Sequence, residues 1–173
     1  MPGPRRSRSR RNETGGAVQA PLSPVETAIR YLTPRRRFER EVAAHLRGKG
    51  FASADVDEAL VRLRELQLVS DEETCRAWIR DRRNFSPRGR SLLRLELLQK
   101  GVAEGIVESV LDDEAPVESE GDAAVDSIRR NWAKYRGLSE AVARRRVWGA
   151  LGRRGFDPET SREAMARFFE ENP

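Results

Sequence analysis

The stretch that decides the fold is residues 37–63, RFEREVAAHLRGKGFASADVDEALVRL. Apolar side chains recur in it at three- and four-residue intervals: Phe38, Val42, Leu46, Val56, Ala59, Leu60 and Leu63. That spacing predicts two amphipathic helices, separated by a Lys-Gly-Phe break at residues 49–51. Neither helix can bury its apolar stripe alone, so each must pack against a further helix.

A similar phrase returns twice along the chain, as Lys100-Gly101-Val102 and as Arg154-Gly155-Phe156. Gly50, Gly101 and Gly155 lie 51 and 54 residues apart. Placing them in register produces two apolar columns, which are Val42, Leu93 and Val147, and Leu46, Leu97 and Leu151. An internal period of this length indicates a repeat architecture. With no strand signal, the sequence predicts an all-α chain of three tandem three-helix repeats.

The domain boundaries follow from this repeat and from shifts in composition. We expect a disordered basic tail over 1–22, repeat 1 over 23–69, repeat 2 over 70–112, an extended acidic linker over 113–122 and repeat 3 over 123–173. The tail is rich in Pro, Arg, Ser and Gly and has little to bury. It reads equally well as a solvated tail or as a non-specific nucleic-acid arm.

Composition narrows the function classes. The chain has 173 residues, 38% hydrophobic and 35% charged, with a single cysteine and a single histidine. These counts exclude an internal disulfide and any ordinary Cys/His metal site. No apolar run is long enough to span a bilayer, and the arginine-rich start is not a secretory signal. We expect a cytoplasmic, monomeric protein without membrane contact. The net charge of +5 points weakly to a polyanion or an acidic protein surface.

No catalytic constellation is evident. Cys75 falls on an apolar helix face, where a buried structural thiol is far commoner than a nucleophile. His45 borders an apolar stripe and is interpreted as a packing residue. The residues Arg47-Gly48-Lys49-Gly50 resemble a helix end more than a phosphate loop. We therefore expect no enzyme activity and no cofactor.

Arginine placement is the strongest functional signal. Arg82, Arg83, Arg88, Arg90 and Arg94 surround a helix-to-helix loop of repeat 2, and Arg35, Arg36 and Arg37 occupy the matching loop of repeat 1. Guanidinium groups fork onto phosphates or carboxylates, so these eight residues form the candidate contact site. A solvated helix face is the competing interpretation. We expect the arginines to be exposed, so that replacing Arg82, Arg83, Arg88 and Arg90 by serine leaves stability unchanged.

Other candidates are weaker. Arg144, Arg145 and Arg146 are consecutive on a helix and so point in different directions. Trp78, Trp132 and Trp148 are interpreted as core anchors rather than stacking platforms.

Several phrases of the sequence resemble the RecX family of RecA regulators. The matching phrases are Cys75-Arg76-Ala77-Trp78-Ile79-Arg80-Asp81-Arg82, Gly89-Arg90-Ser91-Leu92-Leu93, Lys100-Gly101-Val102 and Arg153-Arg154-Gly155-Phe156. The resemblance covers about residues 28–169. It implies an elongated, curved chain that lies in the groove of the RecA filament on DNA. It also implies that this chain limits filament growth, ATP turnover and strand exchange.

Two functions from different classes remain at this point. One is a non-enzymatic regulator whose partner is the RecA filament, with DNA phosphate as a further contact. The other is a DNA-binding module of helix-turn-helix-like units, because three-helix bundles with basic turns also serve that purpose.

Overall fold

The computed structural model describes residues 22–171. Within that range the chain forms nine α-helices: α1 (Pro24–Leu32), α2 (Glu39–Gly48), α3 (Ser53–Glu65), α4 (Asp71–Phe85), α5 (Arg90–Gln99), α6 (Glu104–Glu114), α7 (Glu120–Asn131), α8 (Glu140–Arg153) and α9 (Pro158–Glu171). Two 3-10 turns, η1 (Val117–Ser119) and η2 (Trp132–Lys134), flank α7, and these residues include no strand. The predicted all-α fold is confirmed.

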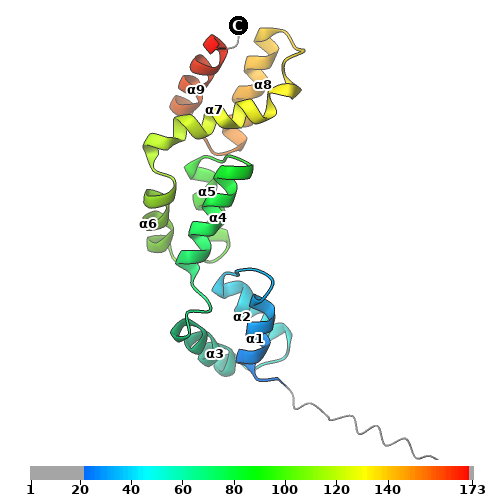
Figure 1. Cartoon of the computed structure of the whole chain (residues 1–173), viewed down its shortest axis with the longest axis vertical. Coiled ribbons are helices and arrows are strands. Elements are labelled where there is room, and N and C mark those ends of the chain that lie inside the picture. The colour runs from blue at the N-terminus through cyan, green and yellow to red at the C-terminus, as the bar shows by residue number, and fades with distance from the viewer. Residues whose placement is uncertain (1–21, 172–173) are drawn as a thin grey trace, which may run out of the picture.

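Each consecutive helix triplet has its own core. Three separate clusters of buried side chains correspond to α1–α3, α4–α6 and α7–α9. They contain, respectively, Val42, Leu46 and Leu63; Leu93, Leu97 and Val107; and Val147, Leu151 and Phe168. The triplets follow one another along the long axis of the molecule, with α1–α3 at one end and α7–α9 at the other (Figure 1). We call them modules one, two and three.

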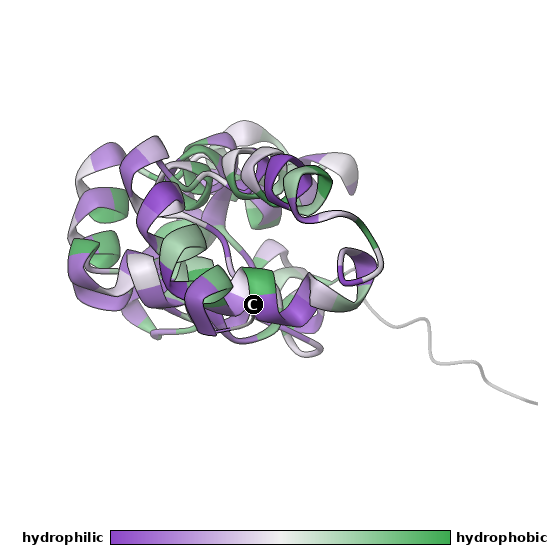
Figure 2. Cartoon of the chain, turned by 90° about the horizontal axis from the view of Figure 1, so that it is seen from above, coloured by the Kyte–Doolittle hydropathy of each residue, from purple (hydrophilic) through white to green (hydrophobic). Residues whose placement is uncertain are grey.

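The helices are amphipathic, as their apolar spacing predicts. Hydrophilic and hydrophobic residues alternate along the same helical ribbons when the molecule is viewed down its long axis (Figure 2). Each helix therefore buries one face and leaves the other to water. Between residues 22 and 171, no helix combines the length and apolar character that crossing a membrane requires.

The three repeated glycines share one backbone conformation. Gly50, Gly101 and Gly155 have φ values of 91°, 87° and 81°, in the left-handed region that L side chains rarely adopt. In each case the amide of the residue after the glycine donates to the carbonyl of the column leucine, at 3.3, 3.3 and 3.2 Å. These bonds close the helix ends as Schellman motifs. The predicted internal repeat is thus a repeat of backbone geometry.

Module one is joined to module two through Phe38. This residue precedes α2, yet its ring is buried in the core of module two and meets Trp78 edge-on at 6.0 Å. The backbone N–H of Glu39 donates to Asp71 at 2.8 Å, and Lys100 contacts Glu41 at 2.9 Å.

Modules two and three are joined by close backbone contact. The amide of Gly89 donates to the carbonyl of Arg154 at 2.8 Å. A Cβ at Gly89 would collide with the carbonyl of Gly155, and a Cβ at Gly155 would collide with Leu92. The absence of side chains at both glycines therefore allows the start of α5 to lie directly on the end of α8.

Residues 113–122 do not form the expected extended linker. α6 continues to Glu114, while η1 and the first turn of α7 occupy most of the remainder. Arginines of α4 neutralise this acidic segment, because Arg76 contacts Asp113 at 2.9 Å and Arg80 contacts Glu114 at 2.7 Å. These partners lie more than 30 residues away in sequence, so local charge density gave the wrong prediction. The basic tail predicted for residues 1–22 lies outside the described residues except for its last position.

Candidate functional site

The arginines predicted as a contact cluster in module two are held by carboxylates of the same molecule. They lie around the end of α4 and the start of α5: Arg82, Arg83, Arg88, Arg90 and Arg94. Each is within ion-pair distance of a glutamate or aspartate. The expectation that these side chains are freely exposed is therefore wrong, and the serine replacement of Arg82, Arg83, Arg88 and Arg90 is now expected to cost stability, because it removes internal ion pairs.

Arg83 and Arg90 hold module three in place through Glu120. The guanidinium of Arg83 contacts the Glu120 carboxylate, and the two side chains are only 13% and 7% exposed. The backbone N–H of Arg90 donates to the second oxygen of the same carboxylate at 2.9 Å. Glu120 therefore fixes the first turn of α7 against α4 and α5.

Arg90 and Arg94 also connect α5 to α6. The Arg90 guanidinium contacts Asp112 at 2.5 Å, and Arg94 contacts Glu108 at 2.5 Å and Glu104 at shorter range. The three carboxylates are spaced four residues apart, which places them along one face of α6. These two arginines thus stabilise the packing of α5 on α6.

Arg82 and Arg88 share a single carboxylate, that of Glu96. The indole N–H of Trp78 donates to Glu96 at 3.1 Å, and the Arg82 guanidinium lies 4.2 Å from the centroid of the Trp78 ring. Two guanidinium groups against one carboxylate leave an excess positive charge. Burial lowers the pKa of Arg88, and the nearby Arg82 and Arg154 charges lower it further.

The three arginines of module one differ in exposure. Arg35 and Arg36 are exposed, and Arg36 makes a loose pair with Glu73 at 3.5 Å. Arg37 is partly buried, with its guanidinium 4.4 Å from the centroid of the Tyr31 ring. Arg35 and Arg36 are the two of this set that solvent or a partner can reach freely.

A groove connects the cations of modules one and two. It has a volume of about 390 Å³, and its lining includes Arg35, Arg36, Trp78 and Lys100. The Lys100 ammonium lies 5.2 Å from the centroid of the Trp78 ring, against which Arg82 also packs. Acidic side chains, Glu41 and Asp81, line the groove as well. We call the successive cations along these contacts the cation track: Arg35, Arg36, Lys100, Arg82, Arg88 and Arg154.

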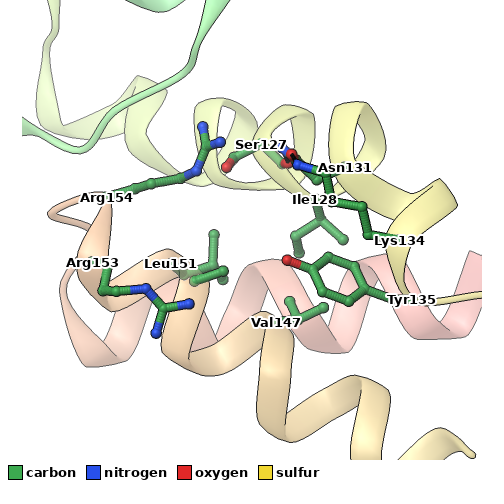
Figure 3. A pocket seen from close by; sticks show the side chains of 10 residues that line it. Ser127, Ile128, Asn131, Lys134, Tyr135, Val147, Leu151, Arg153 and Arg154 are labelled. Atoms are coloured by element: carbon green, nitrogen blue, oxygen red, sulfur yellow. Dashed lines mark hydrogen bonds between the residues drawn. The ribbon is translucent and has the colours of Figure 1, made fainter. Parts of the chain in front are cut away.

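Arg154 is the last residue of the cation track and lies in module three. Its guanidinium donates to the carbonyl of Pro87 at 3.2 Å, beside Arg88. It also borders a cleft of about 240 Å³ between α7 and α8, together with Lys134, Tyr135 and Arg153. Arg153 and Arg154 leave the end of α8 in different directions, and the Tyr135 ring lies on the opposite side of the cleft (Figure 3).

A second basic surface lies on α8. Arg145, Arg146 and Arg153 line a hollow of about 410 Å³ with Tyr135 and Gly149. In the described part of the chain these three arginines have no carboxylate within ion-pair distance, in contrast to those of module two. We call Arg145, Arg146 and Arg153 the α8 basic face. Trp148, on the same helix, is 43% exposed, so its interpretation as a core anchor is wrong.

Sequence reasoning undervalued the α8 basic face because consecutive arginines on a helix diverge. The helix does send Arg144 elsewhere, to Glu140 at 2.7 Å and to the ring of Phe169. The other two arginines line one hollow with Arg153, which lies about two turns further along the helix. The signal that could have found them is regional charge, since residues 129–154 hold nine basic side chains and a single acid.

The reactive side chains considered from sequence are structural. Cys75 is fully buried, and burial raises the pKa of its thiol to about 12, so it carries no nucleophilic thiolate at neutral pH. His45 stacks on Tyr31 with ring centroids 3.9 Å apart. Within residues 22–171, no three His, Cys, Asp or Glu side chains converge as metal ligands would.

Family models match most of the chain. The models described as the first, second and third three-helix domains of RecX match residues 25–63, 70–111 and 118–165. "Regulatory protein RecX" of Streptomyces coelicolor is 30% identical over 171 residues, covering 92% of this chain and 90% of that protein. The protein of the same name from Chlorobium phaeobacteroides is 28% identical over 144 residues, covering 83% and 92%.

Solved structures share the fold along the same length. The crystal structure of RecX from Lactobacillus salivarius has a TM-score of 0.73, covering 85% of this chain and 95% of that one at 20% identity. A second crystal structure, of regulatory protein RecX, also has a TM-score of 0.73, covering 83% of this chain and 71% of that one at 22% identity. These proteins therefore share the overall fold of this chain.

Proposed function

This chain belongs to the RecX family of non-enzymatic regulatory proteins, and from that premise we propose that it binds the RecA filament on DNA and limits filament extension, ATP turnover and strand exchange. It does so in the cytoplasm, as a monomer. The observation that carries the proposal is the unbroken succession of three RecX-type modules, each matched by its own family model. An elongated chain of this kind can bridge neighbouring subunits of a filament.

The joints between modules support a bridging role. A bridge between subunits binds more tightly when its ends are already held at a fixed separation. Glu120 and the Gly89–Arg154 contact fix modules two and three, and the buried Phe38 fixes module one against module two. The protein thus meets its partner largely preorganised, which reduces the entropy lost on binding.

The cation track is the proposed contact with the filament. Its accessible start at Arg35 and Arg36 and the excess charge at Arg82 and Arg88 suit an acidic protein surface or DNA phosphate. Arg83, Arg90 and Arg94 contribute differently. They maintain the shape of the contact surface, because their guanidinium groups are engaged by Glu120, Asp112 and Glu108.

The test is a titration of the protein into the DNA-dependent ATPase reaction of the cognate RecA. We expect inhibition at amounts well below one protein per RecA subunit, and this inhibition should persist when DNA is in excess. A DNA-binding module without RecA contact would instead inhibit only in proportion to the DNA it covers. Relief by excess DNA, or no effect at equimolar protein, would refute the regulator and leave the DNA-binding alternative.

The contribution of the track is measured with paired variants. Arg35→Ser with Arg36→Ser should weaken inhibition several-fold without changing stability, since both side chains are exposed. Arg30→Ser with Arg47→Ser removes the same charge from exposed positions of module one outside the track. Equal loss of inhibition in both pairs would show that overall charge, and not the track, determines binding.

A further inference from the structure

The positive charge of the folded protein is concentrated in one segment. Residues 129–154 hold nine basic side chains and one acid, Glu140, whereas the other described residues hold 19 basic and 26 acidic side chains. Glu140 is already paired with Arg144 at 2.7 Å. The remainder of the folded chain is therefore acidic overall, whereas residues 129–154 of module three carry a net positive charge.

Within this segment the α8 basic face has the shape of an anion site. Arg145, Gly149 and Arg153 are spaced four residues apart, so they follow one line along the helix, with Arg146 beside them. Gly149 has no side chain, which leaves the hollow open between the arginines. A Cβ there would lie 3.2 Å from an Arg153 guanidinium nitrogen, so that group reaches back over the glycine. The three like charges that line this hollow repel one another, and a bound anion relieves that repulsion.

The dimensions favour an extended polyanion over a single ion. Residues 145–153 span about 12 Å along α8 at the rise of an α-helix, and three guanidinium groups line the hollow along this length, which suits successive phosphates of a strand. Guanidinium groups fork onto phosphate oxygens. Exposed Trp148 lies one turn from Arg145, and Tyr135 lines the hollow, so aromatic surfaces for stacking bases lie near the row of charges.

We propose that the α8 basic face, with Tyr135 and Trp148, binds the sugar–phosphate backbone of a single nucleic-acid strand and stacks its bases. This contact is made by module three itself and does not require RecA. It is also separate from the cation track, which meets the α8 basic face only where Arg154 follows Arg153. Failure of the regulator assay therefore leaves this proposal standing, and the reverse holds as well.

The experiment measures anisotropy of a labelled single-stranded oligonucleotide with the full chain, without RecA, over a range of salt concentrations. The variant Arg145→Ser, Arg146→Ser, Arg153→Ser is compared with Arg30→Ser, Arg40→Ser, Arg47→Ser, which removes the same charge from module one. Both keep the basic tail, so its contribution cancels. We expect at least a tenfold weakening in the first variant and less than twofold in the second. The slope of log affinity against log salt should fall by about 2 in the first, as for three lost contacts to a single strand.

Two substitutions at one position separate charge from folding. Gly149→Glu places a carboxylate among the three arginines, and Gly149→Gln fills the same space without charge. Both residues favour a helix more than glycine does, so α8 should persist in circular dichroism. Glutamate should weaken binding several-fold more than glutamine. Equal affinities for the two variants would contradict an anion site at this hollow.

The aromatic contribution and the identity of the ligand are tested last. Trp148→Ala should weaken single-strand binding about tenfold, as expected for one stacked base, and Trp148→Phe should restore most of it. A duplex of the same length should bind more weakly than the single strand. If polyglutamate of matched length competes as well as the oligonucleotide, the surface is one for acidic protein segments and the proposal is overturned.

Discussion

The arginines of α5 and those of α8 show how one residue type takes two roles in repeats of the same fold. In module two, Glu104, Glu108 and Asp112 on α6 face Arg90 and Arg94 and neutralise them. Placing Gly101 and Gly155 in register assigns Pro158, Arg162 and Ala166 to the same three positions of α9. The same register places Arg144 and Trp148 of α8 where α5 has Arg90 and Arg94, so Arg145, Arg146 and Arg153 occupy other positions of the helix. The two surfaces therefore differ both in the neighbouring helix and in the positions of the arginines on the second helix of the module.

The largest expected effect comes from removing the carboxylate that fixes module three. Glu120→Ala leaves the buried Arg83 guanidinium without its partner and the Arg90 amide without an acceptor. Breaking a buried pair on one side costs about 3–5 kcal/mol, which urea unfolding would measure. Glu118→Ala, at an exposed neighbouring acid, should change the free energy of unfolding by less than about 0.5 kcal/mol. Similar values for the two variants would mean that Glu120 is not structural.

A smaller effect separates two glycines that share one backbone conformation. Gly50→Ala introduces only the strain of a left-handed residue, about 1–2 kcal/mol, because nothing lies within 4 Å of the added Cβ. Gly155→Ala adds a collision with Leu92, which should cost about 1–3 kcal/mol more. The melting temperatures of the two variants report this difference. If they coincide, modules two and three are not packed together in solution.

Acidic pH should lower the stability of module two, whose ion pairs need ionised carboxylates. Hydrogen bonds from Arg80, and then the charges of Arg80 and Arg76, hold the pKa of Glu114 below its ordinary value of 4.5. A carboxyl group whose pKa is lower in the folded state stabilises the fold above its unfolded pKa, and this stabilisation is lost as pH falls through the folded pKa. Stability should therefore decline as the pH drops below about 4.5. Unfolding of wild type and of Glu114→Gln at pH 7 and pH 3.5 tests this, since the variant should lose less than wild type.

The smallest expected effect is on the α8 basic face. Arg145→Ser, Arg146→Ser, Arg153→Ser should change the free energy of unfolding by no more than about 0.5 kcal/mol, because no internal ion pair is broken. A slight gain in stability would also fit, since mutual repulsion is removed. Differential scanning calorimetry gives the value. A loss above about 2 kcal/mol would show that these arginines are structural, like Arg83.

The sequence by itself determined the repeat, the helical class and the three cores. Leu46, Leu97 and Leu151 recur because each must be buried at the end of the second helix of its repeat, and Gly50, Gly101 and Gly155 recur because that end needs a positive φ. Both requirements act over a few residues, so they are visible as local patterns.

Only the tertiary structure decided which arginines are paired with carboxylates and which face solvent unpaired. The carboxylates that neutralise Arg83 and Arg90 lie 37 and 22 residues away in sequence, on helices whose facing surfaces the chain pattern does not reveal. An ion pair depends on the distance between two groups in space, and that distance is set by how α4, α5, α6 and α7 pack. Local charge counts accordingly overvalued module two and mistook a neutralised acidic segment for a solvated linker, whereas α8 was undervalued because its consecutive arginines were expected to diverge.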